Sequence, residues 1–328
     1  MIITKTPLRI SFCGGGTDLA AFYEKAGYGA VLSTSIDKFV YLAIHRYFES
    51  KFLLKYSASE IADSVEEIKH PLIRECIRWT GLKDFIEVTS FADIPSSGSG
   101  LGSSSAFSVG LIHALLAFQG KLPSKETCGA GACEVEIEKL LEPIGKQDQY
   151  AAAYGGLNYI RFNAEGSVDV EPVIMPRGAK KTLESRLCMF YTGVTRKASS
   201  ILSEQKANTV SDERKFSALV TMRDQADTLR HSLAAGDLDA MGHLLDAGWQ
   251  LKRELASGIT SPQFDAIYSA ARSAGALGGK LLGAGGGGFF LFYCHEEKQE
   301  ALKQALPELR SVPFAFDSQG TRIIFVED

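Results

Sequence analysis

The sequence predicts an α+β protein of two domains. Short runs rich in apolar, β-branched and aromatic residues fill the first third of the chain, and helical periodicity takes over from Ser103. Strand-like runs return near the C-terminus without strict strand–helix alternation, so a doubly wound parallel sheet is not expected. The 328 residues are enough for two domains. A proline-containing stretch without clear periodicity, Glu171–Leu183, puts the boundary near residue 180, giving domains of residues 1–180 and 181–328.

The expected elements follow in chain order. Five strands open the first domain: Leu8–Cys13, Ala30–Ser35, Phe39–Arg46, Phe52–Tyr56 and Phe85–Phe91. Three helices follow them: Ser103–Gln119, Lys125–Leu141 and Gln147–Tyr154. The second domain should contain one strand, three helical segments and two final strands: Arg186–Tyr191, Ala198–Gly236, Leu238–Ala256, Pro262–Ala274, Phe289–Tyr293 and Arg322–Val326. In the helix that begins at Ser103, apolar residues recur with the spacing of one helix face.

The composition argues against several classes of function. The net charge of −4, without a basic run, argues against nucleic acid as the main partner. No apolar stretch is long enough for a membrane span, and MIITKTPLRI lacks the pattern of a signal peptide, so we expect a cytoplasmic protein. The six cysteines are scattered and the six histidines lack ligand spacing, which favours free thiols and no zinc site.

The segment IPSSGSGLGSSSAF, residues 94–107, contains glycine and serine but no charge. Such a tract can be a flexible linker. This one runs directly into an apolar helix, with Ser103 or Ser104 as the candidate N-cap. The first N–H groups of a helix are unpaired and carry partial positive charge, and preceding glycines let the backbone close over a phosphate. We therefore expect a loop that binds an anion through main-chain N–H groups.

Two further glycine-rich segments are unusual. In PLRISFCGGGTDLAAFY, a strand carrying Arg9 runs into three glycines, Thr17 and Asp18. Thr17 and Asp18 suit the N-cap of an ordinary strand–turn–helix corner. Alternatively, the glycines make room for a ligand, Asp18 accepts hydrogen bonds from hydroxyl groups, and Arg9 offsets negative charge.

The third segment, KLLGAGGGGFFLFYC, formally fits GxGxxG. A helix precedes it and a strand follows it, which is the reverse of a dinucleotide-binding fingerprint. A P-loop pattern is absent from the sequence as well. We expect this glycine tract to pack closely beside a ligand or beside the other glycine loop.

The three segments, in this order, resemble the three signature motifs of the galactokinase, homoserine kinase, mevalonate kinase and phosphomevalonate kinase (GHMP) superfamily. PSSGSGLGSSSA is similar to its PxxxGLGSSAA phosphate loop, and KLLGAGGGG resembles its third motif. PLRISFCGGGTD resembles the sugar-kinase version PGRVNLIGEHTD, but glycines replace the acid–histidine pair and Leu8 replaces a glycine, which separates it from galactokinases.

Four stretches spread over essentially the whole chain look like the D-glycero-D-manno-heptose 7-phosphate kinases: RISFCGGGTDL, SIDKFVYL, EPIGKQDQYAAAYGGLNYIRF and YTGVTRKAS. The resemblance implies a two-lobed α+β GHMP kinase fold, with a ribosomal protein S5 domain 2-like N-terminal lobe and a ferredoxin-like C-terminal lobe. ATP and the sugar would meet in the cleft.

The resemblance also implies roles for single residues. Main-chain N–H groups would bind the ATP phosphates in a loop of Pro95, Gly98, Ser99, Gly100, Leu101, Gly102, Ser103, Ser104 and Ser105. Mg²⁺ would be held by Ser104 and by a glutamate, with Glu136 favoured and Glu138 as the alternative; these point to different sides of a helix, so only one should face the metal. Asp148 matches the aspartate that takes or orients the proton of the acceptor hydroxyl, although such an aspartate is by itself typical of a solvated helix cap. Arg9 matches an arginine near that aspartate.

The implied reaction is ATP-dependent phosphorylation of the anomeric hydroxyl of D-glycero-D-manno-heptose 7-phosphate, giving the 1,7-bisphosphate for nucleotide-activated heptose and surface polysaccharide synthesis. The candidate substrate residues are Gly15, Gly16, Thr17, Asp18 and Arg196. Arg196 and Lys197 would bind the distal phosphate, unless they are a solvated basic pair. A fucokinase-like kinase of a free sugar is one alternative. A regulatory protein that binds sugar and ATP without turnover is another, although it would be expected to lack the base or metal ligands.

Overall fold

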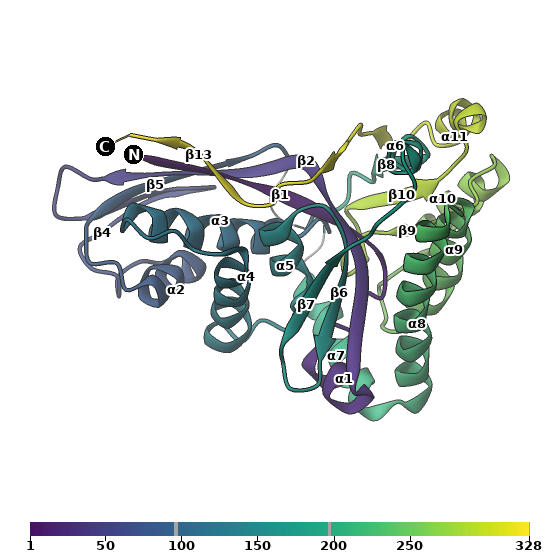
Figure 1. Ribbon diagram of the computed structural model, residues 1–328, viewed down its shortest axis with the longest axis horizontal. Coiled ribbons are helices and arrows are strands. Elements are labelled where there is room, and N and C mark those ends of the chain that lie inside the picture. Colours follow the sequence, from purple (N-terminus) through teal and green to yellow (C-terminus); the bar gives the residue numbers. More distant parts are fainter. Residues whose placement is uncertain (95–97, 196–197, 328) are drawn as a thin grey trace.

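The computed structural model describes residues 1–94, 98–195 and 198–327, and within these ranges the chain forms a mixed α/β fold with two sheets (Figure 1). The first sheet contains β1 (Ile2–Cys13), β2 (Tyr28–Arg46), β3 (Phe52–Lys55), β4 (Ser59–Ala62), β5 (Ile86–Ala92), β6 (Leu157–Asn163), β7 (Val168–Pro172), β12 (Phe316–Asp317) and β13 (Arg322–Val326). The second contains β8 (Leu187–Tyr191), β9 (Gly278–Leu281), β10 (Phe289–Tyr293) and β11 (Arg310–Ser311). The α+β class predicted from the sequence is confirmed.

The first sheet is organised around β2. Its main order is β13-β1-β2-β5-β3-β4, while β6 and β12 also pair with β2 and β7 pairs with β6. The sequence predicted separate strands at Ala30–Ser35 and Phe39–Arg46, but they form one 19-residue strand. The first part of this strand pairs with β6 and the second with β5, while β1 pairs along both parts and β12 pairs with Ser35 and Ile36 between them.

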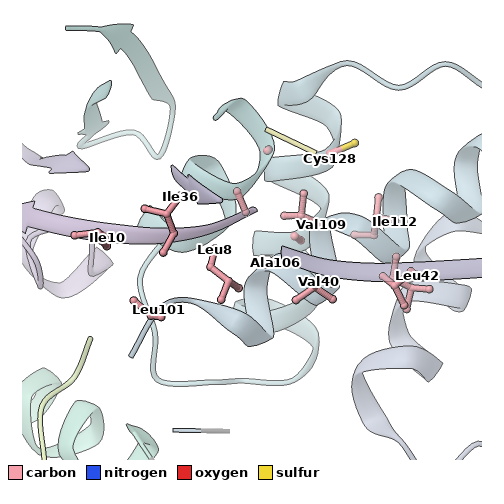
Figure 2. Close-up of a cluster of buried hydrophobic side chains, with 14 of the residues drawn as sticks. Leu8, Ile10, Ile36, Val40, Leu42, Leu101, Ala106, Val109, Ile112 and Cys128 are labelled. Atoms are coloured by element: carbon pink, nitrogen blue, oxygen red, sulfur yellow. The ribbon is translucent and has the colours of Figure 1, made fainter. Parts of the chain in front are cut away.

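Helices cover one face of the first sheet below β1 and β2 in Figure 1: α2 (Pro71–Thr80), α3 (Ser103–Phe118), α4 (Lys125–Cys133) and α5 (Gln147–Tyr154). α3 packs directly on β1 and β2. Figure 2 shows the buried side chains of this contact, among them Leu8, Ile10, Ile36, Val40, Leu42, Ala106, Val109 and Ile112. Each buried aliphatic side chain contributes about 1.5–3 kcal/mol, which holds the N-terminus of α3 in a fixed position against β1.

The remaining helices are α1 (Ala20–Ala26), α6 (Ala179–Ser185), α7 (Ala198–Ser211), α8 (Glu213–Ala235), α9 (Asp239–Lys252), α10 (Pro262–Ser273) and α11 (Gln299–Ala305), with a 3₁₀ turn at Glu296–Lys298. The expected helix 198–236 is divided at Asp212, whose carboxylate accepts hydrogen bonds from the N–H groups of Arg214 and Lys215 and so caps α8. α9 packs on β9 and β10. Together with α10 it encloses a core in which Trp249 and Phe290 are fully buried.

The chain after residue 180 forms the second sheet and then returns to the first one. β13 pairs antiparallel with β1, with Val326 opposite Ile2, so that the two ends of the chain lie side by side (Figure 1). The domain division near residue 180 stays a prediction. In the part of the chain that the structure describes, no helix is both long and apolar enough to cross a membrane.

Candidate active site

A cavity of about 1010 Å³ lies where the three glycine-rich segments meet. Its walls include Arg9, Gly15, Gly16 and Asp18 from the first segment, Gly98 to Ser105 of the loop except Leu101, and Gly283 and Ala284 from the third. Glu136 and Asp148 also line it. The fold thus brings together in one space most of the site residues predicted from distant parts of the sequence.

The loop before α3 owes its shape to glycine at alternate positions. Gly98, Gly100 and Gly102 have φ values of 69°, 74° and 72°, in the left-handed region that side chains disfavour. Gly102 is the N-cap of α3, so the prediction of Ser103 or Ser104 as N-cap is wrong, and no side chain among the described residues caps this helix. The hydroxyl of Ser104 instead donates to Glu136. The first turn of α3 therefore keeps main-chain N–H groups that no capping side chain uses.

The third glycine tract packs backbone to backbone on this loop. A β-carbon at Gly283 would lie 2.4 Å from Gly100 Cα, and one at Gly288 would lie 2.4 Å from Ser99 O. Any side chain at these positions would therefore push the two segments apart. The prediction that this tract packs beside the other glycine loop is confirmed.

Arg9 and Asp148 form a partly buried, two-point ion pair in the wall of the cavity. The Nε and Nη2 atoms of Arg9 donate to Oδ1 and Oδ2 of Asp148, each at 2.7 Å. Nη1 of Arg9 donates to Gly100 O at 2.7 Å, and its main-chain N–H donates to Leu101 O at 3.0 Å. Arg9 is 4% exposed, whereas the side chain of Asp148 is 24% exposed and lines the cavity. The ion pair therefore fixes a carboxylate beside the loop while leaving it accessible to a ligand.

Asp18 lies in the glycine corner with its carboxylate buried. Oδ1 accepts hydrogen bonds from Gly16 N at 3.0 Å and Gln147 Nε2 at 3.2 Å, and Oδ2 accepts one from Gln147 N at 3.2 Å. Burial, and then the charge of Asp148, raises the pKa of Asp18 from 3.8 to about 6. A charged carboxylate held at this cost beside a cavity is suited to accept hydrogen bonds from ligand hydroxyl groups.

The corner corrects two expectations about Thr17 and Asp18. The N-cap of α1 is Leu19, so neither residue caps that helix. Thr17 is fully buried, and its hydroxyl donates to Ala30 O and accepts from Ala30 N. Because Ala30 already uses this hydroxyl, and Thr17 does not line the cavity, its predicted contact with substrate is not supported; Gly15, Gly16 and Asp18 do line the cavity.

Glu136 faces the loop and Glu138 is exposed. The helix predicted for residues 125–141 changes at Glu134 into a π-helix, Glu134–Lys139, which carries both residues. Oε1 of Glu136 accepts a hydrogen bond from Ser104 Oγ at 3.1 Å, and Oε2 accepts one from Gln149 Nε2 at 2.6 Å. Burial raises the pKa of Glu136 to about 7.

The pair of Ser104 and Glu136 suits Mg²⁺ in its chemistry. Both offer hard oxygen ligands, and a protein usually binds this ion through one or two such groups while phosphates and water complete the shell. No group of three or more His, Cys, Asp or Glu residues that could hold a metal occurs within the described ranges. A site for Mg²⁺ here would thus depend on a bound phosphate.

Four predicted residues either lie away from the cavity or fall outside the described ranges. Leu101 has a fully buried side chain in the core, and its N–H donates to Ser99 Oγ at 3.4 Å, so its part in the loop is structural. Pro95, Arg196 and Lys197 lie outside the described residues. Their roles remain as the sequence predicted them.

Sequence reasoning missed an aromatic end of the cavity and two lysines. Tyr56, His70 and Phe107 line the aromatic end; the ring of His70 lies 4.6 Å from that of Tyr56 and 5.8 Å from that of Phe107. These residues lie far apart in the sequence, which gave no signal for their contact. Lys252 and Lys280 are buried in the cavity wall. Lys280 opens the third glycine motif, which is the one signal that could have identified it.

Comparison with known proteins agrees with this geometry. The family model for the GHMP kinases N terminal domain matches residues 42–156, and the model for the GHMP kinases C terminal domain matches residues 229–310. A D-glycero-alpha-D-manno-heptose 7-phosphate kinase of Campylobacter jejuni is 29% identical and covers 98% of either chain. A galactokinase of Pyrococcus furiosus is 26% identical over 93% of this chain and 92% of its own.

A solved structure shares the whole fold. The crystal structure of a D-glycero-D-manno-heptose 1-phosphate kinase from Bacteroides thetaiotaomicron has a TM-score of 0.82 and 25% sequence identity, and the match covers 100% of both chains. The two family models together match more than half of the chain, including the phosphate loop, Glu136 and Asp148. This chain belongs to the GHMP kinase family, and it is an ATP-dependent phosphotransferase.

Proposed function

We propose that this kinase transfers the terminal phosphoryl group of ATP to the anomeric hydroxyl of D-glycero-D-manno-heptose 7-phosphate. The product would be the 1,7-bisphosphate, a precursor of nucleotide-activated heptose for surface polysaccharides. The observation that carries the proposal is the Arg9–Asp148 pair, which lies between the phosphate loop and Asp18 and so between a nucleotide site and a site for hydroxyl groups. The names of the Campylobacter and Bacteroides relatives support a heptose substrate.

The residues would divide the work of the reaction. Phosphoryl transfer requires positioning and charge neutralisation more than covalent chemistry from the protein. Asp148 would hold the acceptor hydroxyl and take its proton, while Arg9 keeps the carboxylate in place. Asp18 would orient the sugar through its hydroxyl groups. Ser104 and Glu136 would hold Mg²⁺, which neutralises charge on the phosphates when it is bound.

The nucleotide would lie with its base at the aromatic end of the cavity. Tyr56, His70 and Phe107 line the same cavity as the loop, and Asp148 lies beside Gly102, the residue at which the loop enters α3. A planar purine can stack on aromatic rings, whereas a sugar requires polar contacts. Burial lowers the pKa of His70, so its imidazole is neutral at physiological pH and suited to stacking. This direction puts the terminal phosphate beside Asp148.

The test is ADP release with ATP, Mg²⁺ and a panel of acceptors: heptose 7-phosphate, heptose 1-phosphate, mannose, fructose and L-fucose. We expect the highest kcat/KM with heptose 7-phosphate and, by phosphorus NMR, a new phosphate on the anomeric carbon. Preference for L-fucose would establish the free-sugar alternative, and preference for heptose 1-phosphate would exclude anomeric transfer. ATP binding without turnover of any sugar would favour the regulatory alternative.

The distal phosphate would be bound by Arg196 and Lys197, as the sequence predicts.

A further inference from the structure

Two lysines in the cavity wall are buried without a carboxylate partner. Lys252, the last residue of α9, is 7% exposed, and its ammonium group donates to Leu281 O at 3.1 Å and to Gly283 O. Lys280, in β9, is 5% exposed and donates to Ser11 O and Phe12 O, each at 2.9 Å. Within the part of the chain that the structure describes, neither lysine forms an ion pair, and both ammonium groups donate to main-chain carbonyl groups.

The lysines add positive charge to a region that already contains Arg9. Burial, and then the charges of Lys280 and Arg9, lowers the pKa of Lys252 well below its ordinary value. Burial lowers the pKa of Lys280 to about 8. Arg9, in contrast to the two lysines, has an acidic partner, because Asp148 balances its charge. Two buried ammonium groups without counter-charge are costly, and an anion in the adjacent cavity would offset that cost.

Lys252 is connected to the loop before α3 through Gly283 of the third glycine tract. Gly283, whose carbonyl group accepts from Lys252, packs on Gly100, and Gly100 O accepts from Arg9, which holds Asp148. The ammonium group therefore lies at the junction between the loop and the third glycine tract, where Arg9, the partner of Asp148, is one of its charged neighbours. In the proposed function the terminal phosphate lies beside Asp148, so an anion at this junction would correspond to that phosphate.

A serine hydroxyl adds an independent observation. Ser11 Oγ lies in the same cavity wall, is buried, and has no hydrogen-bond partner in the described residues. Ser11 is 6% exposed, and its carbonyl group is one of the two that accept from Lys280. Buried hydroxyl groups are normally hydrogen-bonded, so this one is available to a ligand beside Lys280.

We infer that Lys252 and Lys280, with Ser11, form the binding site for the terminal phosphoryl group of the nucleotide. The inference rests on the proposed function, in which ATP occupies the loop. It extends that function by separating two kinds of contact. Main-chain N–H groups of the loop bind phosphates that ATP and ADP share, whereas the lysines bind the phosphate that ADP lacks.

The test compares two nucleotides in the absence of sugar. The dissociation constants of ADP and of the non-hydrolysable β,γ-imido analogue of ATP are measured by calorimetry with Mg²⁺ for wild type and for Lys252→Met, which keeps the length of the side chain but removes its charge. We expect Lys252→Met to weaken binding of the ATP analogue about 10- to 100-fold, the range of a charge-assisted contact. Binding of ADP should change less than about 3-fold.

The controls distinguish a lysine that contacts the terminal phosphate from one that only stabilises the loop. Lys303→Met changes a half-exposed lysine on α11 and should alter neither constant. Lys252→Arg, which keeps the charge, should recover part of the lost affinity for the ATP analogue. Equal weakening of both nucleotides, or no weakening of either, would overturn the inference, because a residue that only supports the loop cannot distinguish them. A wild type that binds neither nucleotide would instead refute the proposed function.

A measurement on wild type covers the case in which Lys252→Met does not fold. From pH 7.5 to 9.5 the affinity for the ATP analogue should fall relative to that for ADP, because the pKa of Lys280 is about 8. The groups that face Lys280 are Arg9, Cys13 and Lys252. Burial raises the pKa of Cys13 to about 12, so its thiol stays neutral over this range. A constant affinity ratio would contradict the role of the lysines.

Discussion

Asp18 should make the stability of this kinase depend on pH in a direction opposite to that of an ordinary ion-paired carboxylate. Its pKa is raised from 3.8 to about 6. Between these values the folded state binds more protons than the unfolded state, so the free energy of unfolding falls as pH rises through 6. At about 1.4 kcal/mol for each pH unit, the full effect is about 3 kcal/mol. Between pH 8 and pH 5, where only part of this titration takes place, the free energy of unfolding should change by about 1 to 2 kcal/mol.

Asp18→Asn removes this titration and lowers the free energy of unfolding by an amount that does not depend on pH. The carboxylate accepts hydrogen bonds from Gly16 N, Gln147 N and Gln147 Nε2, and the amide group of asparagine can accept on one side only. The unsatisfied donor costs about 1–3 kcal/mol at every pH. The difference in unfolding free energy between wild type and variant should therefore grow by about 1 to 2 kcal/mol, in favour of wild type, as pH is lowered from 8 to 5.

The assay is urea unfolding followed by tryptophan fluorescence at pH 5, 6, 7 and 8. Asp63→Asn is the matched control, because the side chain of Asp63 is 70% exposed, and its difference from wild type should not vary with pH. A constant difference for Asp18→Asn over the whole range would refute the reasoning, since it would mean that the buried carboxylate titrates like an exposed one. In the kinase assay at pH 8 the same variant should raise KM for the sugar and leave KM for ATP nearly unchanged.

Two further variants test the reaction centre. Asp148→Asn should lower turnover by roughly 10²–10⁴-fold with little change in ATP affinity, as measured by ADP release and calorimetry, and near wild-type turnover would remove Asp148 from catalysis. Gly102→Ala should lower turnover by at least about 10-fold, because its β-carbon would lie 3.2 Å from Arg9 Cγ and from Asp148 Oδ2 and would displace the ion pair. Gly120→Ala is the matched control, because Gly120 has a φ of +73° against +72° for Gly102 and no atom of the described residues lies within 4 Å of an added β-carbon. Each variant should lose ~1–2 kcal/mol of stability from backbone strain, but Gly120→Ala should keep full activity. Equal losses of activity in the two variants would contradict the ion-pair explanation.

Local features of the sequence were enough to predict the glycine loop ahead of α3 and several helices. The loop could be predicted because a close turn of the backbone ahead of a helix favours glycine, and Gly98, Gly100 and Gly102 have positive φ values there. The bounds of α5, Gln147–Tyr154, agree with the prediction. Resemblance to known motifs added Arg9 and Asp148, and the structure joins these two residues in one ion pair.

Tertiary structure alone decided which side chains face the cavity. Glu136 and Glu138 are equivalent by local pattern, and the π-helix buries one against Ser104 and exposes the other. The sequence predicted Thr17 as a substrate residue, but its hydroxyl is hydrogen-bonded to both the carbonyl group and the N–H group of Ala30 in β2. Lys252 resembles any lysine at a helix end, and its ammonium group is bonded by carbonyl groups of the third glycine motif, 29 and 31 residues further along. A local pattern restricts φ, ψ and periodicity over a few residues, whereas the partner of a buried polar group is set by the distant segments that pack around it.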